Sequence, residues 1–175
     1  MGSLPAEQAK LLGEMFRRYG PSLVLYARQW LPDAAADSAV PAPFLRLMAL
    51  RREPEHVRAF LYRCVRNAAV DAMRTRRRQA AHEAQASVAA AAGRHWLTAQ
   101  LDDQLDAARV AEVLGTLPLE QREVVVMRLW GQLPFREIAA VTGAPISTLH
   151  SRYAAALEAL RRKVEPPCPI SPARS

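Results

Sequence analysis

The stretch that decides the fold is 135-FREIAAVTGAPISTLHSRYAAALEALRRKV-164. Apolar residues recur at helical spacing over 135–141 and again over 146–164, and Gly143 lies between the two segments. A short helix, a tight turn and a longer helix form a helix-turn-helix, whose second helix enters the major groove of DNA. The pattern predicts such a helix from Ile146. An ordinary helical hairpin with a solvated polar face is the alternative.

The predicted second helix has two contrasting faces. The apolar stripe, which we expect to pack on the preceding helices, consists of Ile146, Leu149, Tyr153, Leu157, Leu160 and Val164. Short polar donors and one arginine lie on the opposite face near the helix start. Side chains of these types can meet base edges and phosphates. The candidate DNA contacts of this helix are therefore Ser147, Thr148, His150, Ser151 and Arg152.

A second basic segment lies in the helix that the sequence predicts over 55–78. Its apolar stripe is Val57, Phe60, Leu61, Cys64, Val65, Ala68 and Met73. The rest of the helix carries the arginines 58, 63, 66, 74, 76, 77 and 78, and the segment ends in 74-RTRRR-78. A basic helix end favours phosphate contact, and a solubilising helix end is the alternative. The candidate residues on this helix are Arg63, Asn67, Asp71, Arg74, Arg76, Arg77 and Arg78.

The rest of the chain also predicts helices. They cover 7–30 with an interruption at Gly20-Pro21, 44–50, about 101–115 and 119–130. We therefore expect an all-α chain of two small helical domains, over 1–80 and 101–165. An alanine-rich linker over 81–100 joins them, and a disordered tail rich in proline, serine and arginine follows over 166–175.

Composition narrows the class of function. The net charge of +7 and the pI near 10.2 favour an anionic partner such as nucleic acid. The cysteines, Cys64 and Cys168, have no metal-ligand spacing, and the four histidines are scattered. No nucleophile paired with a base and no glycine-rich phosphate loop is visible. We expect no enzymatic activity, no cofactor and no metal site, and a cytoplasmic protein without a membrane span or signal peptide.

Several stretches together resemble the extracytoplasmic-function sigma factors of the sigma-70 family. Residues 60-FLYRCVRNAAVDAMR-74 resemble the second conserved region of that family, and 117-LPLEQREVV-125 resembles the start of its fourth region. Residues 135-FREIA-139 and 148-TLHSR-152 resemble the family's helix-turn-helix. The likeness covers roughly residues 8–163, with the motifs in the family's order.

The resemblance implies a mechanism. The first domain would dock on core RNA polymerase and hold the −10 promoter element, with Asn67 lining the pocket for a flipped base. The loop 51–57 would be the specificity loop beside that pocket. The second domain would read the −35 element through the helix that starts near Ile146. The implied partners are promoter DNA and core RNA polymerase, and an anti-sigma protein is left open.

The segment 36-ADSAVPAPF-44 departs from the family, which usually has an acidic, glutamine-containing helix before Phe44. Proline is tolerated in the first helical turn but costs about 3 kcal/mol inside a helix. We therefore expect a break near Val40 and a new helix from Pro41. The resemblance assigns polymerase binding to Asp37, Val40, Phe44, Leu45 and Leu47.

These departures leave two functions open. One is a working sigma factor. The other is a sigma-like DNA-binding regulator, or a mimic that captures an anti-sigma protein, with weakened polymerase binding. Ala154 and Ala155 also stand where family members often carry large or basic residues. Alanine cannot form a side-chain hydrogen bond to a base, so promoter reading would rest more on shape and phosphate contact.

Overall fold

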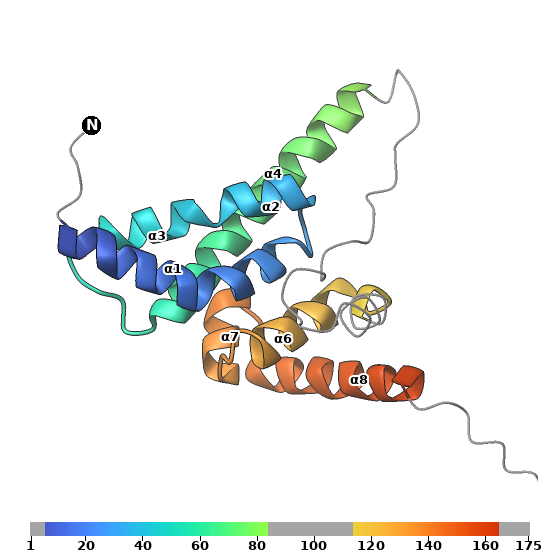
Figure 1. The fold of residues 1–175 in the computed structure, drawn as a ribbon. Helices are drawn as coiled ribbons and strands as arrows, with labels where there is room; N and C mark the ends of the chain where they lie inside the picture. The colour runs from blue at the N-terminus through green and yellow to red at the C-terminus, as the bar shows by residue number, and fades with distance from the viewer. Residues whose placement is uncertain (1–5, 84–113, 165–175) are drawn as a thin grey trace, which may run out of the picture.

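The computed structural model describes residues 6–83 and 114–164. These residues form helices joined by short connections, with no strand among them, which confirms the all-α prediction. The helices labelled in Figure 1 are α1 (Ala6–Ala27), α2 (Asp33–Ala39), α3 (Pro41–Met48), α4 (Val57–Glu83), α6 (Leu119–Leu129), α7 (Phe135–Thr142) and α8 (Ile146–Val164). The predicted tail lies outside the described residues. So do most of the predicted linker and most of the predicted 101–115 helix.

Helices α1 to α4 make up the first domain. Helix α1 packs against α2, α3 and α4, and buried side chains from all four helices meet in its core. Burial of one large apolar side chain contributes about 1.5–3 kcal/mol, so this core supplies much of the stability of the domain. The predicted stripe of α4 is largely correct, but Ala68 is exposed and Ala69 is fully buried.

The expected interruption at Gly20-Pro21 is wrong, because α1 runs through Pro21 without a break. The residues after the proline explain its continuation: Leu23, Tyr26 and Ala27 are fully buried. Their burial outweighs the roughly 3 kcal/mol that an interior proline costs. Gly20 is itself buried, and the ring of Phe16 packs over it.

The predicted break at Val40 is confirmed. Helix α2 ends at Ala39, and α3 begins at Pro41, the first helical position. The N–H groups of a first turn have no intrahelical acceptor, so prolines at 41 and 43 remove no helical hydrogen bond there. Pro41 is exposed, whereas Pro43 is buried in the first domain.

Helices α6, α7 and α8 form the second domain. The predicted 146–164 helix is confirmed, and α7 ends one residue beyond its predicted end. Gly143 caps α7 in the left-handed conformation, with a φ of 76°, and its N–H donates to the carbonyl oxygen of Ala139. The hydroxyl of Thr142 donates to the carbonyl of Ile138 and accepts from the N–H of Ala144. These bonds fix the tight turn between α7 and α8.

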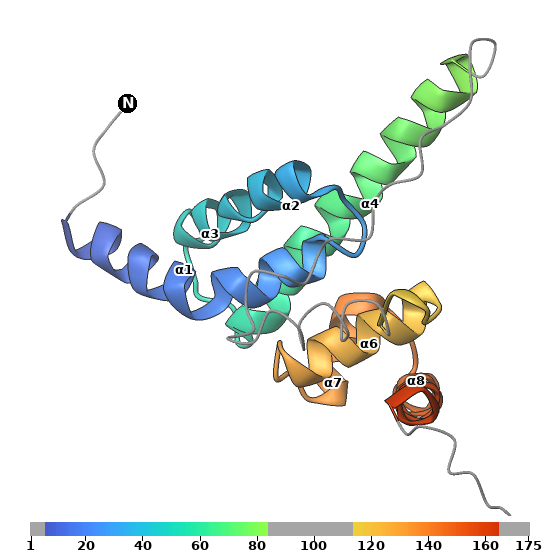
Figure 2. The ribbon, with the colours of Figure 1, turned by 45° about the vertical axis from the view of Figure 1, so that its right-hand side comes forward.

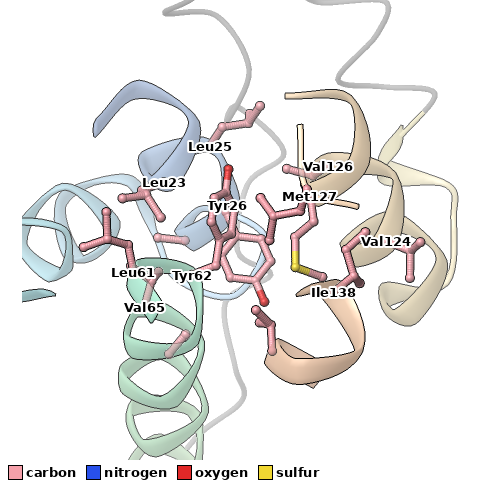
Figure 3. Close-up of a cluster of buried hydrophobic side chains, with 14 of the residues drawn as sticks. Leu23, Leu25, Tyr26, Leu61, Tyr62, Val65, Val124, Val126, Met127 and Ile138 are labelled. Carbon is pink, nitrogen blue, oxygen red and sulfur yellow. The ribbon is translucent and has the colours of Figure 1, made fainter. Parts of the chain in front are cut away.

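The second domain packs directly on the first, with α7 against α4 and α6 against α1 (Figures 1 and 2). Four consecutive residues of α6, 124–127, are fully buried because α8 and α7 cover one side of the helix and the first domain covers another. Figure 3 shows Met127 facing Tyr26 and Tyr62 across this contact. A β-carbon on Gly131 would lie 2.7 Å from the Tyr62 hydroxyl, so the glycine permits this close approach.

Candidate nucleic-acid interface

One candidate surface is the polar face of α4. Arg63, Asn67, Asp71 and Arg74 follow one another at intervals of four, four and three residues, which places them on one side of the helix. All four are exposed. Arg74 lies 3.6 Å from the Asp71 carboxylate, and Thr75 donates a hydrogen bond to the Asp71 carbonyl. An exposed pair of this kind contributes little stability, so both side chains are available to a ligand.

The predicted arginine cluster continues this surface toward the end of α4. Arg76, Arg77 and Arg78 are all exposed. This end of the helix projects beyond the bundle in Figure 1, and α4 itself extends to Glu83, past its predicted end at 78. Clustered guanidinium groups attract phosphate and bind it in a bidentate manner.

Arg66 of α4 does not belong to the exposed surface. Its position in the sequence groups it with the arginines on the polar side of the helix, but in the structure it points into the contact between the domains. Its Nε donates a 2.8 Å hydrogen bond to Glu123, which is only 3% exposed. Its guanidinium also lies over the ring of Trp30, 5.8 Å from the centroid. Arg66 therefore joins the domains.

The second candidate surface is the start of α8. Ser147, His150 and Ser151 are exposed, and Thr148 and Arg152 are half-buried. The turn at Gly143 sets the angle at which α8 leaves α7, so the structure brings the five predicted contacts to one helix start.

The apolar stripe of α8 differs from its prediction. Ile146 is 47% exposed and Leu157 is 40% exposed, whereas Ala156 is fully buried with Leu149. Helix α8 packs against α6 and α7, and its buried stripe is shifted around the helix so that it includes Ala156. Phe135 packs at the start of this stripe, with its ring centroid 5.6 Å from that of Tyr153.

The segment assigned to polymerase binding divides into core and surface residues. Val40, Phe44 and Leu47 are buried in the core of the first domain, so they are not available as a contact surface in this structure. Asp37 is exposed and pairs with Arg28 at 3.2 Å. Leu45 is 55% exposed and borders an apolar groove between α1 and α3 that Leu12, Phe16 and Phe44 also line.

The loop that the resemblance names as the specificity loop connects α3 to α4. Arg51, Arg52 and Glu53 are exposed. His56 is half-buried, and its Nδ1 lies 3.6 Å from the buried carboxylate of Glu137 on α7. The end of this loop therefore also contacts the second domain.

Within 6–83 and 114–164, no cluster of three or more His, Cys, Asp or Glu side chains could hold a metal ion. In the same residues, no helix combines the length and the apolar character that crossing a membrane requires.

The fold and these surfaces define a two-domain helical protein whose second domain ends in a helix-turn-helix. The family model for sigma-70 region 2 matches residues 15–79, and that for sigma-70 region 4 matches residues 107–160. The two regions in this order show that the chain belongs to the sigma-70 family, in its extracytoplasmic-function group.

Individual relatives agree with this assignment. The chain is 39% identical over 59 residues to the ECF RNA polymerase sigma factor RpoE of Cereibacter sphaeroides, a match that spans 34% of this chain and about a third (33%) of the relative's length. Its fold is similar to the sigma factor RpoE, solved in complex with the anti-sigma factor NepR from Bartonella quintana. That structure has a TM-score of 0.67 and 21% identity, and the match covers 89% of this chain and 97% of the other.

A second solved structure is CnrH in complex with the cytosolic domain of CnrY. It has a TM-score of 0.59 and 27% identity, and the match covers 89% of this chain and 88% of the other.

Proposed function

We propose that the chain directs core RNA polymerase to promoters, with the first domain holding the −10 element and the second domain reading the −35 element. The observation that carries this proposal is the helix-turn-helix of α7, Gly143 and α8, because it exposes a polar helix start on a rigid turn. The exposed face of α4 from Arg63 to Arg78 supplies a second, more basic surface. Family membership supports both assignments.

Each surface carries side chains that suit the promoter element proposed for it. Hydroxyl, imidazole and guanidinium groups at the start of α8 can reach base edges in a major groove. The arginines of α4 suit the phosphates of a strand, and Asn67 offers an amide that can bond the edge of an unstacked base. Core polymerase performs the catalysis, so the chain needs no catalytic residue of its own and acts in the cytoplasm.

Contact with core polymerase would involve the surface of α2 and α3. Asp37 and Leu45 are the exposed members of the predicted set. An exposed carboxylate and an exposed leucine at the rim of an apolar groove offer one polar and one apolar contact.

In vitro transcription tests the proposal. Purified core RNA polymerase, the full chain and a library of fragments from the source genome should give transcripts that depend on the chain. Their start sites should share a pair of upstream motifs. Ser147→Ala combined with Arg152→Ala should change or abolish this selection, whereas Glu158→Gln, an exposed change on the same helix, should not.

The outcome also separates the two functions that the sequence leaves open. Binding of the chain to specific fragments without any transcript that depends on it would contradict the sigma-factor proposal and would favour an independent DNA-binding regulator.

A further inference from the structure

Arg136 lies in the first turn of α7, between two residues whose side chains are held by packing. Phe135 before it packs on the ring of His150 of α8. Glu137 after it is buried, and its carboxylate lies 3.6 Å from Nδ1 of His56 in the first domain. Successive residues of a helix are about 100° apart around its axis. The side chain of Arg136 is therefore directed between these two contacts, where it is exposed.

The guanidinium of Arg136 has no hydrogen-bond or ion-pair partner in the part of the chain that the structure describes. Arg128 of α6 is also exposed, but it donates a 3.2 Å hydrogen bond to the carbonyl of Leu133. Residues 114–164 hold seven basic and four acidic side chains, and two of the acids, Glu123 and Glu137, are buried. The surface of the second domain is therefore positive, and Arg136 is free to bind an anion.

The packing of α7 on α8 places Arg136 beside the proposed DNA contacts of α8. Packed helices lie about 8–10 Å apart. A major groove is about 12 Å wide, so a helix that enters it fills it, and a helix packed beside that one lies over the phosphates at the edge of the groove. His150 is exposed at the start of α8 and touches Phe135, so the start of α7 lies at this edge. Arg136 is the next residue along α7, on its exposed side.

We propose that Arg136 binds a backbone phosphate at the edge of the groove that α8 reads, and that this contact adds affinity that does not depend on the base sequence. This inference rests on the proposed function of the second domain and names a further DNA contact for it. A guanidinium binds phosphate in a bidentate manner, and such contacts position a protein on a duplex without reading its bases. Ala154 and Ala155 offer no side-chain hydrogen bond to a base, so a contact to the backbone carries more of the binding.

Duplex binding by the full chain tests this contact. One probe is a short duplex with the upstream motif that the transcription experiment assigns to the second domain, and the other is a scrambled duplex of equal length. Arg136→Ala should weaken binding of both duplexes by about threefold or more, and it should reduce the slope of log K against log salt by about 0.9. The ratio of the two affinities should not change. Arg136→Lys should retain the slope, because it retains the charge.

A matched variant separates a contact at α7 from an effect of net charge. Arg17→Ala removes the same charge from an exposed position of α1, outside the second domain, and it should leave the affinity and the salt slope unchanged. Circular dichroism would confirm that each variant retains the helical content of the native chain.

Duplexes with one neutral phosphate would locate the contact. A methylphosphonate removes the charge of a single phosphate and leaves the bases unchanged. The native chain should lose about threefold or more in affinity at one phosphate beside the motif. Arg136→Ala should lose nothing further at that phosphate, because the two changes remove the same interaction.

The contrary outcomes are equally definite. Equal salt slopes for the native chain and Arg136→Ala overturn the phosphate contact, and so does equal sensitivity of the two proteins to every methylphosphonate. An effect of Arg17→Ala as large as that of Arg136→Ala also overturns it, because net charge would then explain both. If no duplex is bound selectively, the proposed reading of the −35 element fails. The salt slopes on the scrambled duplex would still decide whether Arg136 contacts phosphate.

Discussion

The imidazole ring of His150 lies on the phenyl ring of Phe135, with 3.9 Å between the ring centroids and 33° between the ring planes. The guanidinium of Arg128 on α6 lies over the same phenyl ring, 5.4 Å from its centroid. Phe135 therefore contacts side chains of both α6 and α8. His150 is exposed, and its contact with Phe135 restricts the orientation of its ring. A side chain that reads a base edge needs such a fixed orientation.

Phe135→Leu should retain most of the apolar burial but remove the ring contact to His150. We expect a loss of about 0.5–1.5 kcal/mol in the free energy of unfolding and weaker, less selective binding of a duplex with the second-domain element. Denaturant unfolding and fluorescence anisotropy would measure the two effects. A double-mutant cycle with His150→Ala would show whether they are coupled. Unchanged selectivity would mean that Phe135 serves packing alone.

Changing Arg76, Arg77 and Arg78 together to alanine should weaken DNA binding across sequences and flatten its dependence on salt. Each lost phosphate contact removes roughly 0.7–0.9 from the slope of log K against log salt, so the slope should fall by about 2–3. The matched control is the triple change to lysine, which retains the charge. Equal salt slopes for the native chain and the alanine variant would show that these arginines do not contact phosphate.

Asn67→Ala should reduce open-complex formation far more than it lowers the melting temperature. Asn67 is exposed on α4, and surface substitutions usually change stability by less than about 0.5 kcal/mol. Permanganate reactivity of the melted promoter would follow the open complex, and calorimetry would follow melting. Ala68→Ser, an exposed neighbour on the helix, is the control. A parallel loss of both quantities would identify Asn67 as a structural residue instead.

Pro41→Gln with Pro43→Ala should strengthen binding to core RNA polymerase at least tenfold. The double change allows α2 and α3 to join into one helix and returns one polar side chain to an exposed position. Pro41→Gln alone should give part of this gain, since Pro43 is buried and its truncation loses some packing. Titration of labelled chain against core enzyme decides the question. If the native chain already binds with nanomolar affinity and the changes have no effect, the break at Val40 does not weaken the contact.

Unfolding at alkaline pH should reveal the buried tyrosines. Burial raises the pKa of Tyr26, with a further contribution from the Glu123 carboxylate, and burial raises the pKa of Tyr62. The unfolded chain therefore loses these protons first, so the stabilisation is present below pH 10 and is lost as pH rises above it. Above pH 10, each tyrosine should lower the free energy of unfolding by up to about 1.4 kcal/mol per pH unit. Tyr26→Phe should make this decline shallower, and an unchanged slope would contradict the assignment.

The helix-turn-helix was predictable because its signals are local. Gly143 marks the end of α7, apolar spacing marks α8, and Pro41 marks the start of α3. Long-range packing caused the errors. The burial of Leu23 and Tyr26 carried α1 through Pro21, and the buried stripe of α8 includes Ala156 instead of Ile146 and Leu157.

The exposed candidates on α4 and α8 could be identified from helical spacing, but the contact between the domains could not. Tyr26 and Glu123 are 97 residues apart, and no local pattern relates them. The one available signal was a glutamate directly before the apolar run 124–127. A helix with four buried residues in succession must pack against other helices on more than one side. A carboxylate that is buried in such packing needs hydrogen-bond donors from the neighbouring helices.

Gly131 limits how freely the two domains can be exchanged between proteins. Its missing side chain leaves room for the Tyr62 hydroxyl at one side and for the Met127 carbonyl and Leu133 at the others. A chimera that joins this first domain to a foreign second domain would need a glycine at the same place or a smaller residue than Tyr62. Gly131 and Tyr62 would therefore have to be transferred together. Recombination at the domain boundary alone would give chains in which each domain folds but the two domains do not pack against each other.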